Sequence, residues 1–95
     1  MTRSRTDGIQ PVVIRIFRAY GFSVKDTSRV GGGFPDLVLG FRSKNFLVEV
    51  KNDTGVGWKY TPAQKKFNDT WNGQRITITS TQEAAEFAEK VRHEN

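Results

Sequence analysis

The stretch that decides the fold is GGGFPDLVLGFRSKNFLVEVKN, residues 31–52, which has the pattern of two apolar strands joined by a short turn. Asp36 follows a proline in the first strand, and Glu49 and Lys51 stand one residue apart in the second. Burying an unpaired carboxylate or ammonium group costs a free energy comparable with the net stability of a small domain. These three ionisable residues therefore need a physical explanation.

Upstream of this stretch, the pattern predicts a helix and then a strand. Apolar residues recur at helical spacing over residues 9–20, so an amphipathic helix is expected there. Asp7 or Gly8 could cap it, and Gly8 fits slightly better because Pro11 must occupy the first turn, where a missing N–H is tolerated. Residues 22–27 then predict a first strand, with Val24 facing inward.

The quoted stretch itself predicts a hairpin. Its strands cover residues 35–39 and 46–51, and residues 40–44 form the turn. Because the connection is short, the two strands should pair antiparallel.

Downstream, the sequence TPAQ predicts the start of a second helix, with Thr61 as cap, Pro62 at the first position and Gln64 as capping-box partner. Three apolar residues are expected on the inner face of this helix: Ala63, Phe67 and Trp71. Residues 75–79 predict a fourth strand. A last helix follows STQE and buries a stripe of four residues: Ala84, Phe87, Ala88 and Val91.

The predicted order of elements, α-β-β-β-α-β-α, belongs to the α/β class. A strand, a crossover helix and a further strand make the third and fourth strands parallel neighbours. The expected architecture is a mixed four-stranded sheet flanked by helices.

Size and composition limit the possible functions. With 95 residues the chain forms one domain, expected over residues 7–95 after a basic, mobile tail at residues 1–6. The absence of cysteine excludes disulfides and thiolate zinc sites, and the only histidine, His93, is poorly placed for a Ser-His-Asp triad. Neither a membrane-spanning run nor a signal peptide is visible, so a soluble, cytoplasmic protein is expected.

The charge is unevenly distributed. Fifteen Lys and Arg against ten Asp and Glu give a net charge of +5. Residues 1–75 hold thirteen basic and six acidic residues, whereas residues 76–95 hold two and four. A basic body favours a polyanionic partner, most commonly nucleic acid, although a basic soluble protein without such a partner has the same composition.

The alternation of the third strand brings the charged residues together. Glu49 and Lys51 share one face, about 6 to 7 Å apart, and Asp36 reaches that face from the paired strand. Two neighbouring carboxylates repel unless a cation lies between them. Asp36, Glu49 and the Val50 carbonyl would suit Mg²⁺ or Mn²⁺, with waters completing the coordination. Lys51 could then activate the attacking water or offset charge on a phosphate during phosphodiester hydrolysis.

Each half of this pattern also has an ordinary explanation. Glu-x-Lys on a strand commonly marks a surface ion pair of little energetic value. Asp after Pro is a common turn residue. The combination on two paired strands is more specific than either half.

FPD followed by VEVK resembles the PD-(D/E)xK nuclease superfamily, and the chain is most similar to its virus-type replication-repair nuclease (VRR-NUC) domains of phages and bacteria. The similarity extends over TDGIQ, GGGFPDLVLG, FLVEVKN, TPAQKKF and ITITSTQEA. It implies a restriction-endonuclease-like core. It also implies that Asp36 and Glu49 are metal ligands, that Lys51 is the catalytic lysine and that Gln64 belongs to the site.

Two glutamines leave the site open to interpretation. Many members of the family have a Glu on the first helix, where this chain has Gln10, and an amide is a weaker metal ligand than a carboxylate. One metal ion is therefore expected rather than two. Gln10 could instead be solvated, and Gln64 could be only the capping partner of Thr61.

Several residues beside the site are candidates for binding DNA. Ser28 and Arg29 lead into a loop of three glycines whose N–H groups could contact a phosphate: Gly31, Gly32 and Gly33. Trp58, Lys59 and Tyr60 interleave aromatic rings with a charge, which suits stacking on an exposed base. Lys65 is expected to flank the cleft. Each candidate also has a structural explanation. The glycines could simply form a flexible hairpin loop, the aromatic segment could pack against the second helix, and Lys65 could lie on a solvated helix face.

These features favour a metal-dependent DNA endonuclease. No base-reading element is visible, so recognition of DNA shape is expected. Stand-alone members of the family are similar in being homodimers, whose two active sites can cut opposed strands of a four-way junction. The resemblance therefore implies a homodimer that cleaves four-way (Holliday) junctions or branched DNA, in repair or another pathway. The alternatives are a flap, nicking or restriction-like endonuclease on the same core, and a DNA-binding module with a degenerate site.

Overall fold

The computed structural model describes residues 8–52 and 57–94, which form seven elements in the order α-β-β-β-α-β-α. This result confirms the α/β class and the mixed four-stranded sheet flanked by helices. The predicted tail at residues 1–6 lies outside the described residues. Within the described part of the chain, no helix has the length and apolar character needed to cross a membrane.

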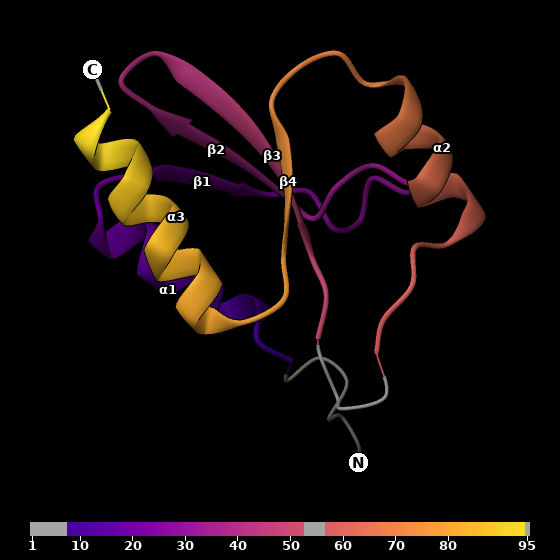
Figure 1. Cartoon of the computed structure of the whole chain (residues 1–95), viewed down its shortest axis with the longest axis horizontal. Coiled ribbons are helices and arrows are strands. Elements are labelled where there is room, and N and C mark those ends of the chain that lie inside the picture. Colours follow the sequence, from indigo (N-terminus) through magenta and orange to yellow (C-terminus); the bar gives the residue numbers. More distant parts are fainter. Residues whose placement is uncertain (1–7, 53–56, 95) are drawn as a thin grey trace.

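Three helices and four strands make up the fold (Figure 1). The helices are α1 (Gln10–Ala19), α2 (Pro62–Thr70) and α3 (Thr81–His93). The strands are β1 (Ser23–Asp26), β2 (Leu37–Phe41), β3 (Lys44–Val50) and β4 (Arg75–Ile78). Each strand begins and ends within two residues of its predicted bounds, and the elements follow one another in the predicted order.

The sheet has the order β1-β2-β3-β4. β1 and β3 both pair antiparallel with β2, and β4 pairs parallel with β3, as predicted for a crossover through a helix. The β2–β3 turn is tighter than expected, because Arg42 and Ser43 alone connect the two strands, with φ of 52° and 68°. Two consecutive positive φ angles match the turn twist that a two-residue hairpin requires.

One face of the sheet carries the hydrophobic core. α1 and α3 pack side by side against it (Figure 1), and the core residues Phe17, Leu37, Leu39 and Val48 are fully buried. The predicted stripe of α3 is confirmed, with Ala84, Ala88 and Val91 buried and Phe87 partly buried against the core.

The start of α1 differs from the prediction. Its N-cap is Ile9, which makes no side-chain cap; the Ile9 N–H instead donates to Asn52 Oδ1 at 2.8 Å. Gly8 does not cap the helix. A Cβ at Gly8 would lie 2.3 Å from the Asn52 amide, so the glycine permits this close approach. Asn52, which follows the VEVK sequence, therefore anchors the start of α1.

α2 lies on the opposite face of the sheet from α1 and α3 (Figure 1). Its predicted capping box is present: Thr61 Oγ1 accepts from the Gln64 N–H at 3.1 Å, and Gln64 Oε1 accepts from the Thr61 N–H at 2.9 Å. The predicted inner face is only partly correct, because Phe67 is partly buried but Ala63 and Trp71 are exposed. α2 buries no residue fully, so it covers its face of the sheet loosely.

Candidate active site

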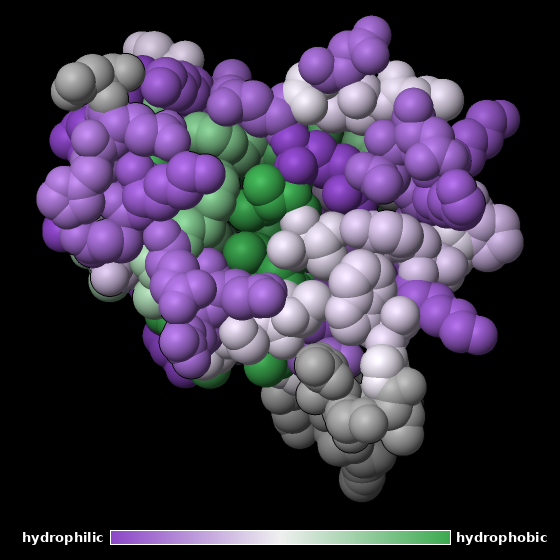
Figure 2. All heavy atoms as spheres, in the orientation of Figure 1, coloured by the Kyte–Doolittle hydropathy of each residue, from purple (hydrophilic) through white to green (hydrophobic). Residues whose placement is uncertain are grey.

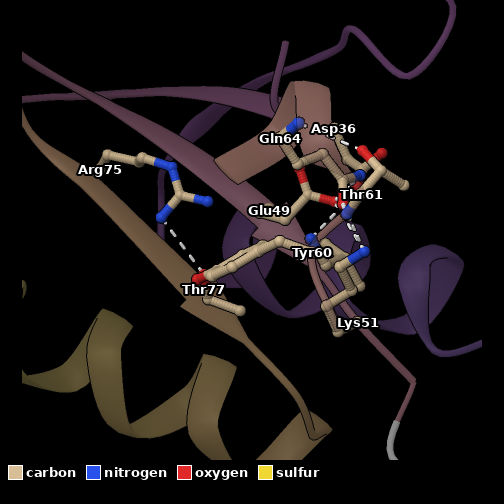
Figure 3. A network of polar contacts seen from close by, with 9 residues as sticks. Asp36, Glu49, Lys51, Tyr60, Thr61, Gln64, Arg75 and Thr77 are labelled. Carbon is tan, nitrogen blue, oxygen red and sulfur yellow. Dashed lines mark hydrogen bonds and ion pairs between the residues drawn. The ribbon is translucent and has the colours of Figure 1, made fainter. Parts of the chain in front are cut away.

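The sheet brings the three motif residues to the face that α2 covers. Phe46 and Val48 belong to the core, so Leu47 and Glu49 point to the other face of β3. Leu37 is paired with Val48, which places Asp36, one residue before β2, opposite Glu49. Figure 3 shows Asp36, Glu49, Lys51 and Gln64 converging at one end of the strands.

Asp36 is fixed by the backbone of the neighbouring strand. Its Oδ2 accepts a hydrogen bond from the Val50 N–H at 2.8 Å. This bond orients the carboxylate toward β3 and uses one of its two oxygens. Val50, predicted to offer its carbonyl to a metal, thus lies beside Asp36 and also supplies the donor that positions it.

Glu49 is the only charged residue in the described part of the chain that is buried, at 2% exposure. Its Oε2 accepts from Gln64 Nε2 at 3.0 Å and lies 3.9 Å from Lys51 Nζ. Its Oε1 has no hydrogen-bond partner among the described residues. A buried carboxylate oxygen without a donor is costly, so this atom points to a missing partner.

The pKa of the Glu49 carboxyl is raised from its ordinary value of 4.5 to about 7, first by burial and second by the neighbouring Asp36 carboxyl group. Lys51 and Arg75 act in the opposite direction but do not compensate. At neutral pH the two carboxyl groups therefore require either a shared proton or an added cation.

A divalent cation fits this donor set. Asp36 and Glu49 supply hard oxygen ligands side by side, and the unpartnered Glu49 Oε1 is available for coordination. Among residues 8–52 and 57–94 no group of three His, Cys, Asp or Glu residues is gathered. The remaining ligands would have to be water, backbone carbonyl or substrate oxygens, as is common for Mg²⁺.

Lys51 is held in the site by Gln64. Lys51 Nζ donates to Gln64 Oε1 at 2.6 Å, and the same oxygen accepts the capping bond from Thr61. Gln64 therefore caps α2 and also contacts both Lys51 and Glu49.

Gln10 lies apart from this cluster. Its Nε2 is 3.5 Å from Asp26 Oδ2, and no hydrogen bond joins it to Asp36 or Glu49 in the described structure. It lines a cavity of about 460 Å³ with Asp26, Ser28, Arg29, Val50 and other residues. The predicted Ser28 and Arg29 thus meet Gln10, although not the carboxylate pair itself.

Asp26, which the sequence did not single out, organises this cavity. Its Oδ1 accepts from the Ser28 N–H at 2.9 Å and from Ser28 Oγ at 2.6 Å. These bonds, more than its proximity to Arg29, hold the pKa of Asp26 below its usual range. An Asp two residues before a Ser is a turn signal that the sequence does contain.

The three glycines adopt the conformation that glycine favours. Gly31, Gly32 and Gly33 have φ of 83°, 66° and 82°. Space beside Gly31 and Gly32 is open, so a ligand can approach their backbone, whereas a Cβ at Gly33 would lie 2.3 Å from the Ala63 carbonyl oxygen. The loop therefore combines a free tip with a base packed against α2.

The aromatic candidates lie in the segment before α2, and Tyr60 contacts β4. Trp58 is 37% exposed and packs edge-on against Tyr60 with ring centroids 5.0 Å apart. The Tyr60 hydroxyl is 2.6 Å from Thr77 Oγ1. Lys59 is exposed, and Lys65, also exposed, forms an ion pair with Asp69 at 3.0 Å.

Arg75 is a site residue that the sequence reasoning missed. It lies 5.2 Å from the Tyr60 ring centroid and opposite Leu47 in the β3–β4 register, on the face of Glu49. The signal was present in RITI, because Arg75 and Thr77 alternate with two isoleucines that face the core.

Comparison of the chain with protein-family models, with curated proteins and with solved structures finds no match.

Proposed function

We propose that this protein is a metal-dependent DNA endonuclease with a restriction-endonuclease-like core, of the VRR-NUC type in the PD-(D/E)xK superfamily. One observation carries the proposal: Glu49, 2% exposed, lies beside Asp36 with a buried oxygen that no described residue satisfies. A surface ion pair gives no reason to bury two carboxyl groups side by side, whereas a metal ion held between them does.

The chemistry follows from the donor set. Asp36 and Glu49 would hold Mg²⁺ or Mn²⁺, which supplies Lewis acidity to a phosphate oxygen and makes water a better nucleophile. Lys51 places an ammonium group next to the carboxylates, where it can orient the attacking water and offset charge on the phosphate. Gln64 keeps Lys51 Nζ and Glu49 Oε2 at fixed positions through its amide.

The partner proposed is DNA, recognised by shape and charge. The chain carries +5, and the open backbone at Gly31 and Gly32 lies in the loop that precedes Asp36. Nothing in the described residues resembles a helix that would read base edges. A junction or branched DNA substrate, met in the cytoplasm of a bacterial or infected cell, is consistent with these features.

We propose that the protein acts as a homodimer, so that two sites can cut opposed strands of a four-way junction. β4 is a sheet edge, and edge strands offer unpaired backbone groups to a second chain. Figure 2 shows apolar side chains at the surface between α3 and α2, flanked by hydrophilic ones. A surface of this kind supports association between copies.

The test is a cleavage panel with labelled four-way junctions, flaps and linear duplex, in Mg²⁺, Mn²⁺ or EDTA. We expect paired nicks on the junction that require a metal ion. Lys51→Ala and Asp36→Asn should lose about 10³-fold in rate while still binding DNA. Lys90→Ala, on α3, removes an equal charge from the other side of the molecule and serves as control. Cutting of linear duplex at a single sequence would contradict the junction specificity.

A second candidate function, a DNA-binding module with a degenerate site, has one specific observation behind it. Gln10 is neutral and is turned to Asp26, so α1 adds no carboxylate to the pair. Binding by the wild-type protein without cleavage in either metal would establish this candidate and reject the nuclease.

A further inference from the structure

Arg75 opens β4 on the face of the sheet that carries the candidate active site. β3 and β4 are parallel, with Leu47 opposite Arg75 and Glu49 opposite Thr77. Arg75 therefore lies on the strand next to Glu49, two residues before the partner of Glu49, and its guanidinium group faces the Tyr60 ring (Figure 3).

Neutral groups fix the position of the guanidinium. Arg75 Nη1 donates to Thr77 Oγ1 at 3.3 Å, and the guanidinium carbon lies 5.2 Å from the centroid of the Tyr60 ring. The Tyr60 hydroxyl is in turn 2.6 Å from Thr77 Oγ1. An arginine held in this way loses little conformational freedom when it binds an anion, because its geometry is set beforehand.

The same guanidinium lacks an anionic partner in the part of the chain that the structure describes. No carboxylate there lies within ion-pair distance of Arg75, and Arg75 Nε is buried without a hydrogen bond. A guanidinium has five N–H donors, of which the described residues engage one. A partly buried, positioned guanidinium with unused donors is suited to an oxyanion such as a phosphate, because its planar fork of N–H groups can engage two phosphate oxygens.

We propose that Arg75 binds a backbone phosphate of the DNA strand, adjacent to the phosphate that is cleaved, and that Tyr60 and Thr77 position its guanidinium for this contact. The proposal rests on the proposed function for the identity of the ligand as DNA. The glycine loop, the other candidate for phosphate contact, precedes β2, whereas Arg75 lies on β4. The DNA strand would therefore be held on both sides of the carboxylates. Tyr60 then acts through Arg75 rather than by stacking on a base.

The alternative is that Arg75 only offsets the charge of Glu49, whose pKa it lowers. A purely internal counter-charge would affect folding and the carboxylate pair but would release no counterions from DNA. The dependence of DNA affinity on salt separates the two, because each phosphate contact contributes about 0.7 to 0.9 to the slope of log K against log salt.

The experiment measures binding of a fluorescent four-way junction by anisotropy in EDTA, where no divalent cation supports cleavage, over a series of KCl concentrations. We expect Arg75→Gln to lower the slope by about one and the affinity by roughly tenfold. Arg75→Lys should restore the slope because it keeps the charge. Thr77→Val should weaken binding at an unchanged slope, because it removes the hydrogen bonds to Arg75 and Tyr60 that position the guanidinium but removes no charge. Arg92→Gln, an exposed arginine on α3 paired with Glu89, is the matched control and should leave the slope unchanged.

A folded Arg75→Gln protein with the wild-type slope would overturn the proposal, and thermal melting of each variant establishes that it is folded. Cleavage in Mg²⁺ is scored separately. If the wild type cuts and the slope is unchanged, only the Arg75 proposal fails. If the wild type never cuts but Arg75→Gln lowers the slope, the nuclease proposal fails and the contact of Arg75 with a DNA phosphate stands. If no DNA is bound at all, both are rejected.

Discussion

On the face of the sheet that α1 and α3 cover, the residues that meet the helices are apolar and closely packed, as the burial of Phe17, Leu37 and Val48 shows. On the opposite face, Glu49 is buried among polar groups, and α2 contributes no fully buried residue. The first face has the features of a stabilising core. The second keeps ionisable groups at a cost in stability, as functional sites do. Substitutions on the two faces should therefore have different consequences.

The largest expected effect is on the core face. Phe17 is fully buried and packs its ring against Phe22 and Phe87. Phe17→Ala should lower the free energy of unfolding by about 3 to 5 kcal/mol, measured by urea denaturation. Trp71→Ala, on the α2 face at 44% exposure, should cost about 1 kcal/mol or less, although it removes a larger side chain. Equal costs for the two variants would contradict the distinction between the faces.

A smaller effect on the free energy of unfolding is expected at Glu49, where substitution should stabilise the protein at high pH instead of destabilising it. Its folded-state pKa of about 7 exceeds its ordinary value of 4.5, so between these pH values the folded protein binds a proton that the unfolded chain does not. Stability in EDTA should therefore fall as pH rises from 5 to 7.5, by roughly 2 kcal/mol, and level off above that. Glu49→Gln should remove this dependence and be the more stable protein at pH 8.

Urea denaturation at several pH values measures the dependence. Glu86→Gln, an exposed glutamate on α3, is the control and should keep the wild-type profile. A Glu49→Gln protein that follows the same pH profile as the wild type would show that Glu49 ionises normally and that its burial has no electrostatic cost.

The smallest effects distinguish the two functions of Gln64. Thr61→Ala and Gln64→Ala each break the capping box of α2 and should each cost about 1 kcal/mol. Only Gln64→Ala also removes the contacts to Lys51 and Glu49. We expect junction cleavage to fall by roughly tenfold or more in Gln64→Ala and by less than about twofold in Thr61→Ala. Equal rates in the two variants would reduce Gln64 to a helix cap.

The sequence predicted most of the fold because the local signals agreed with one another. The period-two pattern of residues 46–50 and the capping sequence at Thr61 each specify a structure through neighbouring residues alone. The start of α1 could not be predicted in this way, since Ile9 is held by Asn52, which is 43 residues away. Long-range hydrogen bonds of this kind leave no periodic trace in the sequence.

The candidate site was predictable where it depends on neighbouring residues and strand pairing, and not where it depends on packing between distant elements. Asp36, Glu49 and Lys51 follow from strand alternation and hairpin register, and the structure brings them together. Arg75 was missed although the parallel pairing of β4 with β3 was predicted, because its nearness to Glu49 depends on the register of that pairing, which strand patterns do not specify. The place of Gln10 beside Asp26 depends on how α1 packs, which the sequence does not specify.

The central claim is that Asp36 and Glu49 share a divalent cation, and titration calorimetry with Mn²⁺ at pH 6.5 tests it most directly. We predict one Mn²⁺ per chain. Two buffers of different ionisation enthalpy should reveal release of most of one proton, because Glu49 is largely protonated without metal at that pH. Asp36→Asn should abolish the binding. The absence of any binding heat in the wild-type protein, or unchanged binding in Asp36→Asn, would contradict the account.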